Sequence, residues 1–86
     1  MVLTVDVGNT RIKGAVFEGY NTIEFLVFYK EEIQKKIEEI LKKHKKITHL
    51  VVASVGNVDK NLFLYFQKEV EVWFVSHEDA FPFANN

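Results

Sequence analysis

Apolar and polar residues alternate in short runs over the first 29 residues of the chain. The runs at residues 2–7, 11–18 and 22–29 are rich in β-branched and aromatic residues, and the short segments between them contain Gly and Asn. Runs of this length, separated by such residues, predict strands joined by tight turns. The chain therefore begins with a predicted meander of three strands.

Residues 30–46 have the spacing of an amphipathic helix. Ile33, Ile37, Ile40 and Leu41 fall at i, i+4, i+7 and i+8, which places them in one apolar stripe. Glu and Lys residues four positions apart on the remaining surface add about 0.2–0.5 kcal/mol for each pair. The predicted pairs are Glu31/Lys35, Glu32/Lys36, Glu38/Lys42 and Glu39/Lys43.

The second half of the chain predicts a strand at residues 47–55, a helix at residues 57–68 and a strand at residues 70–76. Asn57 can cap this second helix, and its predicted inner face carries Leu62, Tyr65 and Phe66. Trp73 is expected in the core or in an interface. The predicted order is thus βββαβαβ in a single α/β domain, residues 1–86. Right-handed helical crossovers would place the last two strands parallel to the first, in a mixed sheet with helices packed on it.

Composition narrows the class of protein. The chain has 86 residues, 48% of them hydrophobic, with no cysteine and a net charge of −1. The nearly balanced charge does not favour binding to nucleic acid. No apolar run is long enough to cross a bilayer, and no signal peptide is visible. The lysines of residues 42–46 and His44 are explained by the favourable end of a helix dipole and by solvation. We therefore expect a cytoplasmic protein with no nucleic-acid or membrane partner.

Candidate chemistry is concentrated in the first predicted turn. Gly8 permits a positive φ and a close backbone approach, Asn9 and Thr10 add uncharged hydrogen-bonding groups, and Lys13 returns on the next strand as a mobile positive charge. Asp6 is a carboxylate suited to Mg²⁺. Phosphoryl transfer requires such parts, because its catalysis is mostly positioning and charge stabilisation. A purely structural hairpin turn explains the same residues equally well.

Ser54 is a second candidate, at the carboxyl end of the fourth predicted strand. Ligands collect at the carboxyl ends of strands in open α/β sheets, so Ser54 could face the same crevice as Asp6. Close packing of a helix against small residues is an equally good explanation of Ala53 and Ser54.

The sequence DVGNTRIK at residues 6–13 resembles the first phosphate motif of the type III pantothenate kinases, which belong to the superfamily of acetate and sugar kinases, heat-shock chaperone ATPases and actin. The opening Asp-x-Gly-x-Thr is shared across that superfamily, and Gly-Asn-Thr with Lys13 narrows the likeness to this family. Residues 51–55 resemble the family's strand beside the active site, and residues 81–86 resemble the segment before its pantothenate-binding stretch. The resemblance covers about the first third of a usual family member.

This resemblance implies a ribonuclease-H-like (actin-like ATPase) half-domain and ATP-dependent phosphorylation of pantothenate. Asp6 would hold Mg²⁺ with the phosphoryl group, while Gly8, Asn9, Thr10, Lys13 and Ser54 would bind the nucleotide. The family's general-base Asp lies in a Gly-x-Asp-Arg segment that does not occur here. No catalytic base is therefore expected in this chain, which would be a truncated N-terminal phosphate-binding domain without the domain that completes the nucleotide site. Family members are generally homodimers, and many need a monovalent cation, K⁺ or NH₄⁺.

Two other interpretations remain. One is a non-catalytic accessory or regulatory homologue that keeps the fold without the chemistry. The other is a small α/β interaction domain whose hairpin only looks like a phosphate loop, since function resides in sites carried by a fold.

Overall fold

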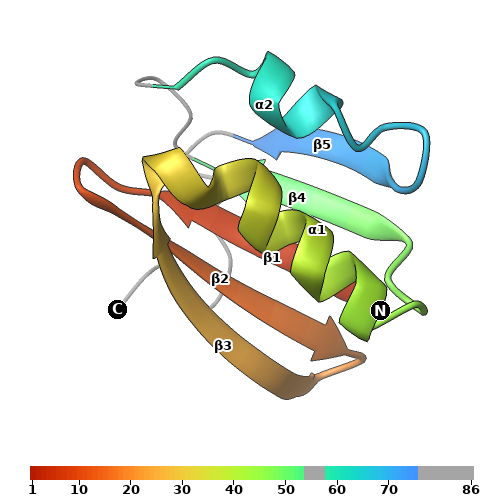
Figure 1. Cartoon of the computed structure of the whole chain (residues 1–86). Helices are drawn as coiled ribbons and strands as arrows, with labels where there is room; N and C mark the ends of the chain where they lie inside the picture. Colours follow the sequence, from red (N-terminus) through yellow and green to blue (C-terminus); the bar gives the residue numbers. More distant parts are fainter. Residues whose placement is uncertain (54–57, 76–86) are drawn as a thin grey trace.

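The described part of the chain forms one five-stranded mixed sheet with helices packed on it (Figure 1). The computed structural model describes residues 1–53 and 58–75. None of the helices in those ranges is long and apolar enough to cross a membrane. The elements are β1 Val2–Val7, β2 Arg11–Glu18, β3 Asn21–Tyr29, the 3₁₀ helix η1 Lys30–Glu32, α1 Ile33–Lys43, β4 His49–Ala53, α2 Asn61–Leu64 and β5 Glu71–Val75.

The strand order is β3-β2-β1-β4-β5. β2 pairs antiparallel with both β1 and β3, whereas β4 runs parallel to β1, and β5 runs parallel to β4. The predicted meander and the predicted parallel crossovers are both confirmed. β1 is the central strand, because it is the third of the five in this order, between β2 and β4.

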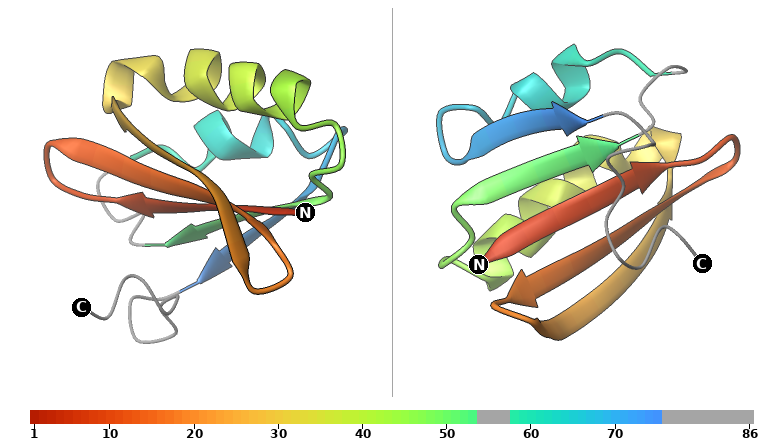
Figure 2. Two further views of the ribbon diagram at one scale, coloured as in Figure 1. Left: turned by 90° about the horizontal axis from the view of Figure 1, so that it is seen from below. Right: turned by 180° about the vertical axis from the view of Figure 1, so that it is seen from behind.

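Both helices cover the same face of the sheet, here called the helix face (Figure 2). Side chains alternate across each strand, so Leu3, Val5 and Val7 of β1 point into the core, whereas Val2, Thr4 and Asp6 lie on the opposite, open face. Thr4 is nevertheless buried, and its hydroxyl donates to the carbonyl oxygen of Ala15 at 3.3 Å. The fully buried side chains under the helices include Phe28, Phe63, Phe66, Leu3, Ile12, Ile33, Ile37 and Leu50.

The first helix is shorter than predicted at both ends, because its first turn is 3₁₀ and α1 ends at Lys43. Glu32 accepts a hydrogen bond from the backbone N–H of Tyr29 at 3.1 Å, and α1 follows directly. The stripe of Ile33, Ile37 and Ile40 is buried as predicted. Among the predicted ion pairs, Glu38–Lys42 forms at 3.5 Å. The predicted Glu39/Lys43 pair is wrong: Glu39 lies 3.9 Å from Lys36, and Lys43 reaches a carboxylate on β3 instead.

The second helix differs more from its prediction. α2 has four residues, and the turns after it bond from residue i to i+3, as in Phe66 N–H to Phe63 O at 3.0 Å. Residues three apart eclipse each other in such turns, so Phe63 and Phe66 share the buried side. The predicted inward position of Tyr65 is wrong, since its side chain is exposed. The predicted cap Asn57 lies outside the described residues.

The last two strands begin later than predicted, at His49 and Glu71. Ile47 and Val70 are buried just before β4 and β5 begin. Trp73 is 54% exposed on the open face, and its indole N–H donates to Glu71, so a core position is wrong for Trp73 within the described structure. The predicted ends of these strands, residues 54–55 and 76, lie outside the described residues.

A cluster of charged and polar side chains joins the carboxyl end of α1 to β3. Glu24 on β3 accepts hydrogen bonds from His44 Nε2 at 2.9 Å and Lys43 Nζ at 3.0 Å. His44 is therefore not simply solvated at a helix end, as its sequence position had indicated. The hydrogen bond from His44 and, to a smaller extent, the hydrogen bond from Lys43 lower the pKa of Glu24, because they stabilise its charged form. The cluster links the carboxyl end of α1 to the outer strand.

Stability should depend on this cluster only while Glu24 is charged. Because the pKa of Glu24 is lowered in the folded state, its contribution is present above the unfolded-state pKa of about 4.3 and is lost as the pH falls through the folded-state pKa. We expect Glu24→Gln to lower the free energy of unfolding at pH 7 by about 0.5–1 kcal/mol, since Lys43 is largely exposed. Urea titrations at pH 7, 5, 4 and 3 would measure the difference from wild type, which should shrink below about pH 4.5. Glu31→Gln, an exposed substitution outside the cluster, is the control. A difference independent of pH would contradict this assignment.

Candidate functional site

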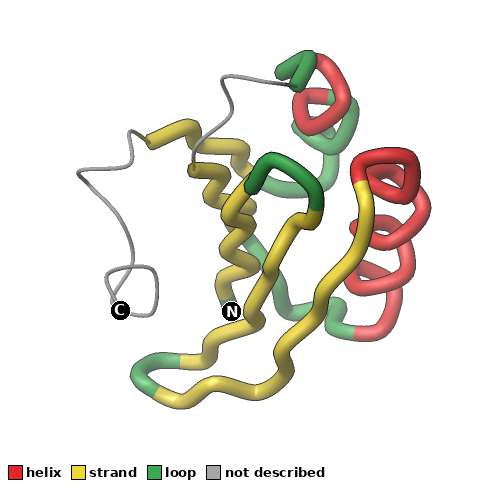
Figure 3. Tube along the Cα trace, turned by 90° about the vertical axis from the view of Figure 1, so that its left-hand side faces the viewer, coloured by secondary structure: helices red, strands yellow, loops and turns green. Residues whose placement is uncertain are grey.

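The turn between β1 and β2 is a two-residue hairpin (Figure 3). Val7 is paired with Ile12, and the Gly8 N–H donates to the Arg11 carbonyl oxygen at 3.0 Å. Asn9 and Thr10 are therefore the two loop residues, and both are exposed. The turn lies at the carboxyl end of the central strand, where ligands collect in α/β sheets.

Gly8 is required by the hairpin itself. A Cβ atom at this position would lie 2.8 Å from the Arg11 carbonyl oxygen, closer than real side chains approach a backbone atom. Gly8 does not use the positive φ that glycine permits; among the glycines of the described ranges, Gly19 has a positive φ, at 62°. This steric limit supports the explanation of Gly8 as a residue that the turn requires. Its backbone N–H is already used in the hydrogen bond to Arg11.

Asp6 and Lys13 are brought together across the two strands. They are directly opposed in the β1–β2 register, and both lie on the open face. Asp6 is half-buried and Lys13 is exposed. No ion pair joins the two side chains within residues 1–53 and 58–75, so the carboxylate and the ammonium group are both available to a ligand.

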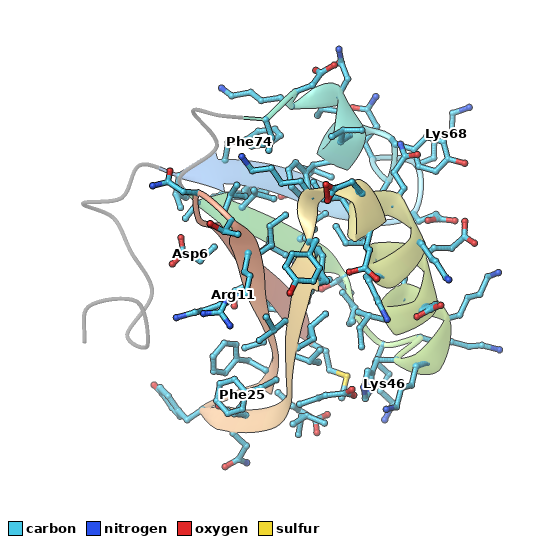
Figure 4. All side chains as sticks on the ribbon, turned by 60° about the vertical axis from the view of Figure 1, so that its left-hand side comes forward. Asp6, Arg11, Phe25, Lys46, Lys68 and Phe74 are labelled. Atoms are coloured by element: carbon cyan, nitrogen blue, oxygen red, sulfur yellow. The ribbon has the colours of Figure 1, made fainter. Side chains whose placement is uncertain are left out.

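Arg11 is a candidate that sequence reasoning missed. It precedes Lys13 by two positions in β2, so both side chains lie on the same face, with about 7 Å between their Cα atoms. Figure 4 shows the Asp6 and Arg11 side chains directed away from the helices. The period of two along the strand could have identified Arg11. The hairpin therefore presents two cations and one carboxylate on one face.

The donor set suits Mg²⁺ bound jointly with phosphate. Mg²⁺ is usually held by one or two carboxylates together with phosphate oxygens and waters. Asp6 supplies one such carboxylate, and no group of three potential metal-ligating side chains gathers within the described parts of the chain. Asp6 would therefore bind the ion together with a phosphorylated ligand.

β4 brings a second strand end to the same edge. Ala53, its last residue, is paired with Asp6 in the parallel β1–β4 register. Ser54, the next residue, was predicted to face this crevice and lies outside the described residues. The structure thus brings Asp6, Gly8, Asn9, Thr10 and Lys13 together, while the prediction for Ser54 remains untested.

Over its whole length the chain is similar to proteins named type III pantothenate kinase. It is 59% identical over 85 residues to the protein of Flavobacterium johnsoniae, 54% identical over 87 residues to that of Flavobacterium psychrophilum, and 33% identical over 85 residues to that of Christiangramia forsetii. These matches cover 99%, 100% and 99% of this chain but only 35%, 36% and 35% of the respective relatives. The chain therefore spans about a third of the length of these relatives. No family model matches it.

The fold is similar to part of a sugar kinase of known structure. The ROK hexokinase from Thermus thermophilus superposes with a TM-score of 0.61 over 88% of this chain and 33% of that chain, at 14% sequence identity. At this identity the likeness concerns the fold alone. Together with the mixed five-stranded sheet, it confirms the predicted ribonuclease-H-like half-domain of the actin-like ATPase type.

The steric role of Gly8 can be tested against that of Gly19. Gly8→Ala and Gly8→Asn should both destabilise the chain by about 1–3 kcal/mol, because any Cβ meets the Arg11 carbonyl. At Gly19 a Cβ would meet nothing within 4 Å, and only the positive φ opposes a side chain. Gly19→Asn should therefore cost less than Gly19→Ala, since Asn tolerates the left-handed region. Urea unfolding followed by circular dichroism would measure all four variants. If Gly8→Asn were milder than Gly8→Ala, backbone conformation rather than contact would govern this turn.

Proposed function

We propose that this chain is the N-terminal phosphate-binding part of a type III pantothenate kinase, which transfers a phosphoryl group from ATP to pantothenate and yields 4′-phosphopantothenate. The observation that carries the proposal is the combination of 59% identity over 85 residues with a hairpin that opposes Asp6 to Lys13 on one face. This reaction is the first committed step towards coenzyme A.

Each hairpin residue has a role suited to phosphoryl transfer. Asp6 would hold Mg²⁺, which neutralises charge on the phosphate oxygens when bound. The Thr10 hydroxyl and the loop backbone are uncharged donors for the same oxygens. Lys13 lies opposite Asp6 and would offset the negative charge that develops on the transferred group. These groups position and stabilise, which is most of what this class of reaction needs from a protein.

The 86 residues alone are proposed to have little or no kinase activity. Their sequence has no Gly-x-Asp-Arg segment for the general base, and they span about 35% of the relatives they match. A kinase also needs groups on the far side of the nucleotide, which a single half-domain cannot supply. For the whole protein we propose a cytoplasmic homodimer that uses Mg²⁺ and a monovalent cation, K⁺ or NH₄⁺.

An interaction domain is the second candidate function. The observation in its favour is Gly8, whose presence is explained by the hairpin without any ligand. The two candidates differ in one property, the binding of nucleotide phosphate by the hairpin.

The kinase proposal is tested by release of ADP from Mg·ATP in the presence of pantothenate. We expect turnover from the protein of the full natural reading frame and none from the 86-residue chain. Asp6→Asn in the long form should reduce turnover by about 10²-fold or more, since a metal ligand is lost. Glu18→Gln, at the opposite end of β2, is the matched control and should leave turnover unchanged. An inactive but folded long form would contradict the proposal.

Phosphate binding by the hairpin can be tested on the 86-residue chain itself. Titration with Mg·ADP should shift the amide resonances of residues 8–13, with a dissociation constant on the order of 1 mM because half of the site is absent. Lys13→Gln and Arg11→Gln should each weaken binding severalfold. Lys46→Gln, an exposed charge change beyond α1, should have no effect. Unchanged hairpin resonances at about 10 mM Mg·ADP would favour the interaction domain.

A further inference from the structure

Arg11 differs in kind from every other basic residue of the chain. It is the only arginine, and the rest of the 11 basic residues are lysines. The ammonium group of lysine is a compact, strongly hydrated charge on a flexible stem, which suits a solvated surface. The planar guanidinium of arginine presents parallel N–H donors that match two oxygens of one phosphate. The one arginine of this chain thus flanks the turn that is proposed to bind phosphate.

The charged side chains of β1 and β2 on the open face gather at the hairpin end of the sheet. They are Asp6, Arg11 and Lys13, of which Figure 4 labels the first two. The other open-face positions of these two strands carry no charge; they are Val2, Thr4, Ala15 and Phe17. A ligand with several negative charges would therefore lie along this end of the face.

Arg11 is two residues closer to the turn than the Asp6–Lys13 pair. Its neighbour across the β1–β2 ladder is Gly8, whose N–H donates to the Arg11 carbonyl oxygen at 3.0 Å. Since glycine has no side chain, β1 places neither a carboxylate nor any other side chain beside Arg11. Arg11 forms no ion pair within residues 1–53 and 58–75. Its guanidinium is therefore available to a ligand on the Gly8 side.

Tyr29 on β3 is the neighbour of Arg11 on the other side. The register opposes the two residues directly. Because the backbone of Arg11 bonds towards β1, Arg11 and Tyr29 form a non-hydrogen-bonded pair, the kind in which side chains are closest. Tyr29 is held by its own backbone N–H, which donates to Glu32 at 3.1 Å, and its side chain is 53% exposed. An aromatic ring at this position can restrict the stem of Arg11 from the β3 side and leaves the Gly8 side open.

We propose that Arg11 binds a phosphate group that stays with the nucleotide, beside the transferred phosphate at Asp6 and Lys13. This inference rests on the proposed function and deepens it. A single phosphate satisfies Lys13 and a cation at Asp6, since those two residues are directly opposed. Arg11 and Lys13 are about 7 Å apart at their Cα atoms, so their side chains can reach neighbouring phosphates of one chain. Arg11 thereby makes the hairpin selective for nucleosides with two or more linked phosphates.

AMP and ADP test this selectivity, because they differ by one phosphate and share the rest of the molecule. The 86-residue chain is titrated with each at constant Mg²⁺ and ionic strength, and the amide resonances of residues 8–13 give two dissociation constants. We expect wild type to bind ADP about tenfold more tightly than AMP. Arg11→Gln should remove most of this preference and leave AMP binding unchanged. Lys13→Gln should weaken both ligands and keep the ratio, and Lys46→Gln is the control that should change neither.

Two further measurements separate paired hydrogen bonding from charge alone. Arg11→Lys keeps the charge but loses the parallel donors, so it should recover less than half of the lost preference. The side-chain Nε–Hε resonance of Arg11 is assigned without ambiguity, because the chain has one arginine. This resonance should shift with Mg·ADP and much less with AMP.

Three results would overturn the inference while the proposed function stands, since in each of them Mg·ADP still shifts the hairpin amides. The first is an unchanged ADP-to-AMP ratio in Arg11→Gln. The second is an equal fall of this ratio in Lys13→Gln, which would indicate a general effect of charge. The third is full recovery in Arg11→Lys. If neither nucleotide shifts the hairpin amides of the wild type, phosphate binding by the hairpin fails, and the role of Arg11 fails with it.

Discussion

The central position of β1 is the constraint on which the site depends. This strand pairs with β2 on one side and β4 on the other, so its position is fixed by two registers. Asp6 is paired with Lys13 in one register and with Ala53 in the other. A slip of β1 by one residue would turn Asp6 to the helix face. Its carboxylate would then be buried without hydration, which is energetically costly. Placement of the candidate site is therefore a consequence of how the core is packed.

The sequence predicted the hairpin and sheet well because those features are local. β1 and β2 have the predicted bounds, since the two-residue turn leaves only one register in which Leu3, Val5 and Ile12 are all buried. α2 was predicted poorly, because the 3.6-residue pattern used for Tyr65 does not apply where turns bond from i to i+3. The end of a helix depends on tertiary contacts that the spacing of apolar residues does not reveal. Lys43, for example, forms an ion pair with Glu24 on β3.

The sequence predicted which hairpin residues lie together but not what each of them does for the turn. The Asp6–Lys13 pair follows from strand alternation and was within reach of the sequence. The steric need for glycine at position 8 could not be predicted from the sequence, since the close approach to the Arg11 carbonyl depends on the shape of the closed turn. The exposure of Trp73 also could not be predicted, because both faces of the sheet carry apolar residues and periodicity does not say which face a helix will cover.

In the proposed function, the groups that the hairpin offers suit phosphate and a hard cation. Both belong to Mg·ATP and are common to the substrates of all ATP-dependent kinases, so Asp6 and Lys13 cannot distinguish pantothenate from a sugar. The likeness to a hexokinase at 14% identity makes the same point, because the fold persists while almost the whole sequence differs. For the proposed kinase, dependence of turnover on pantothenate, rather than ATP consumption alone, is accordingly the property that would separate it from other enzymes built on the same half-domain.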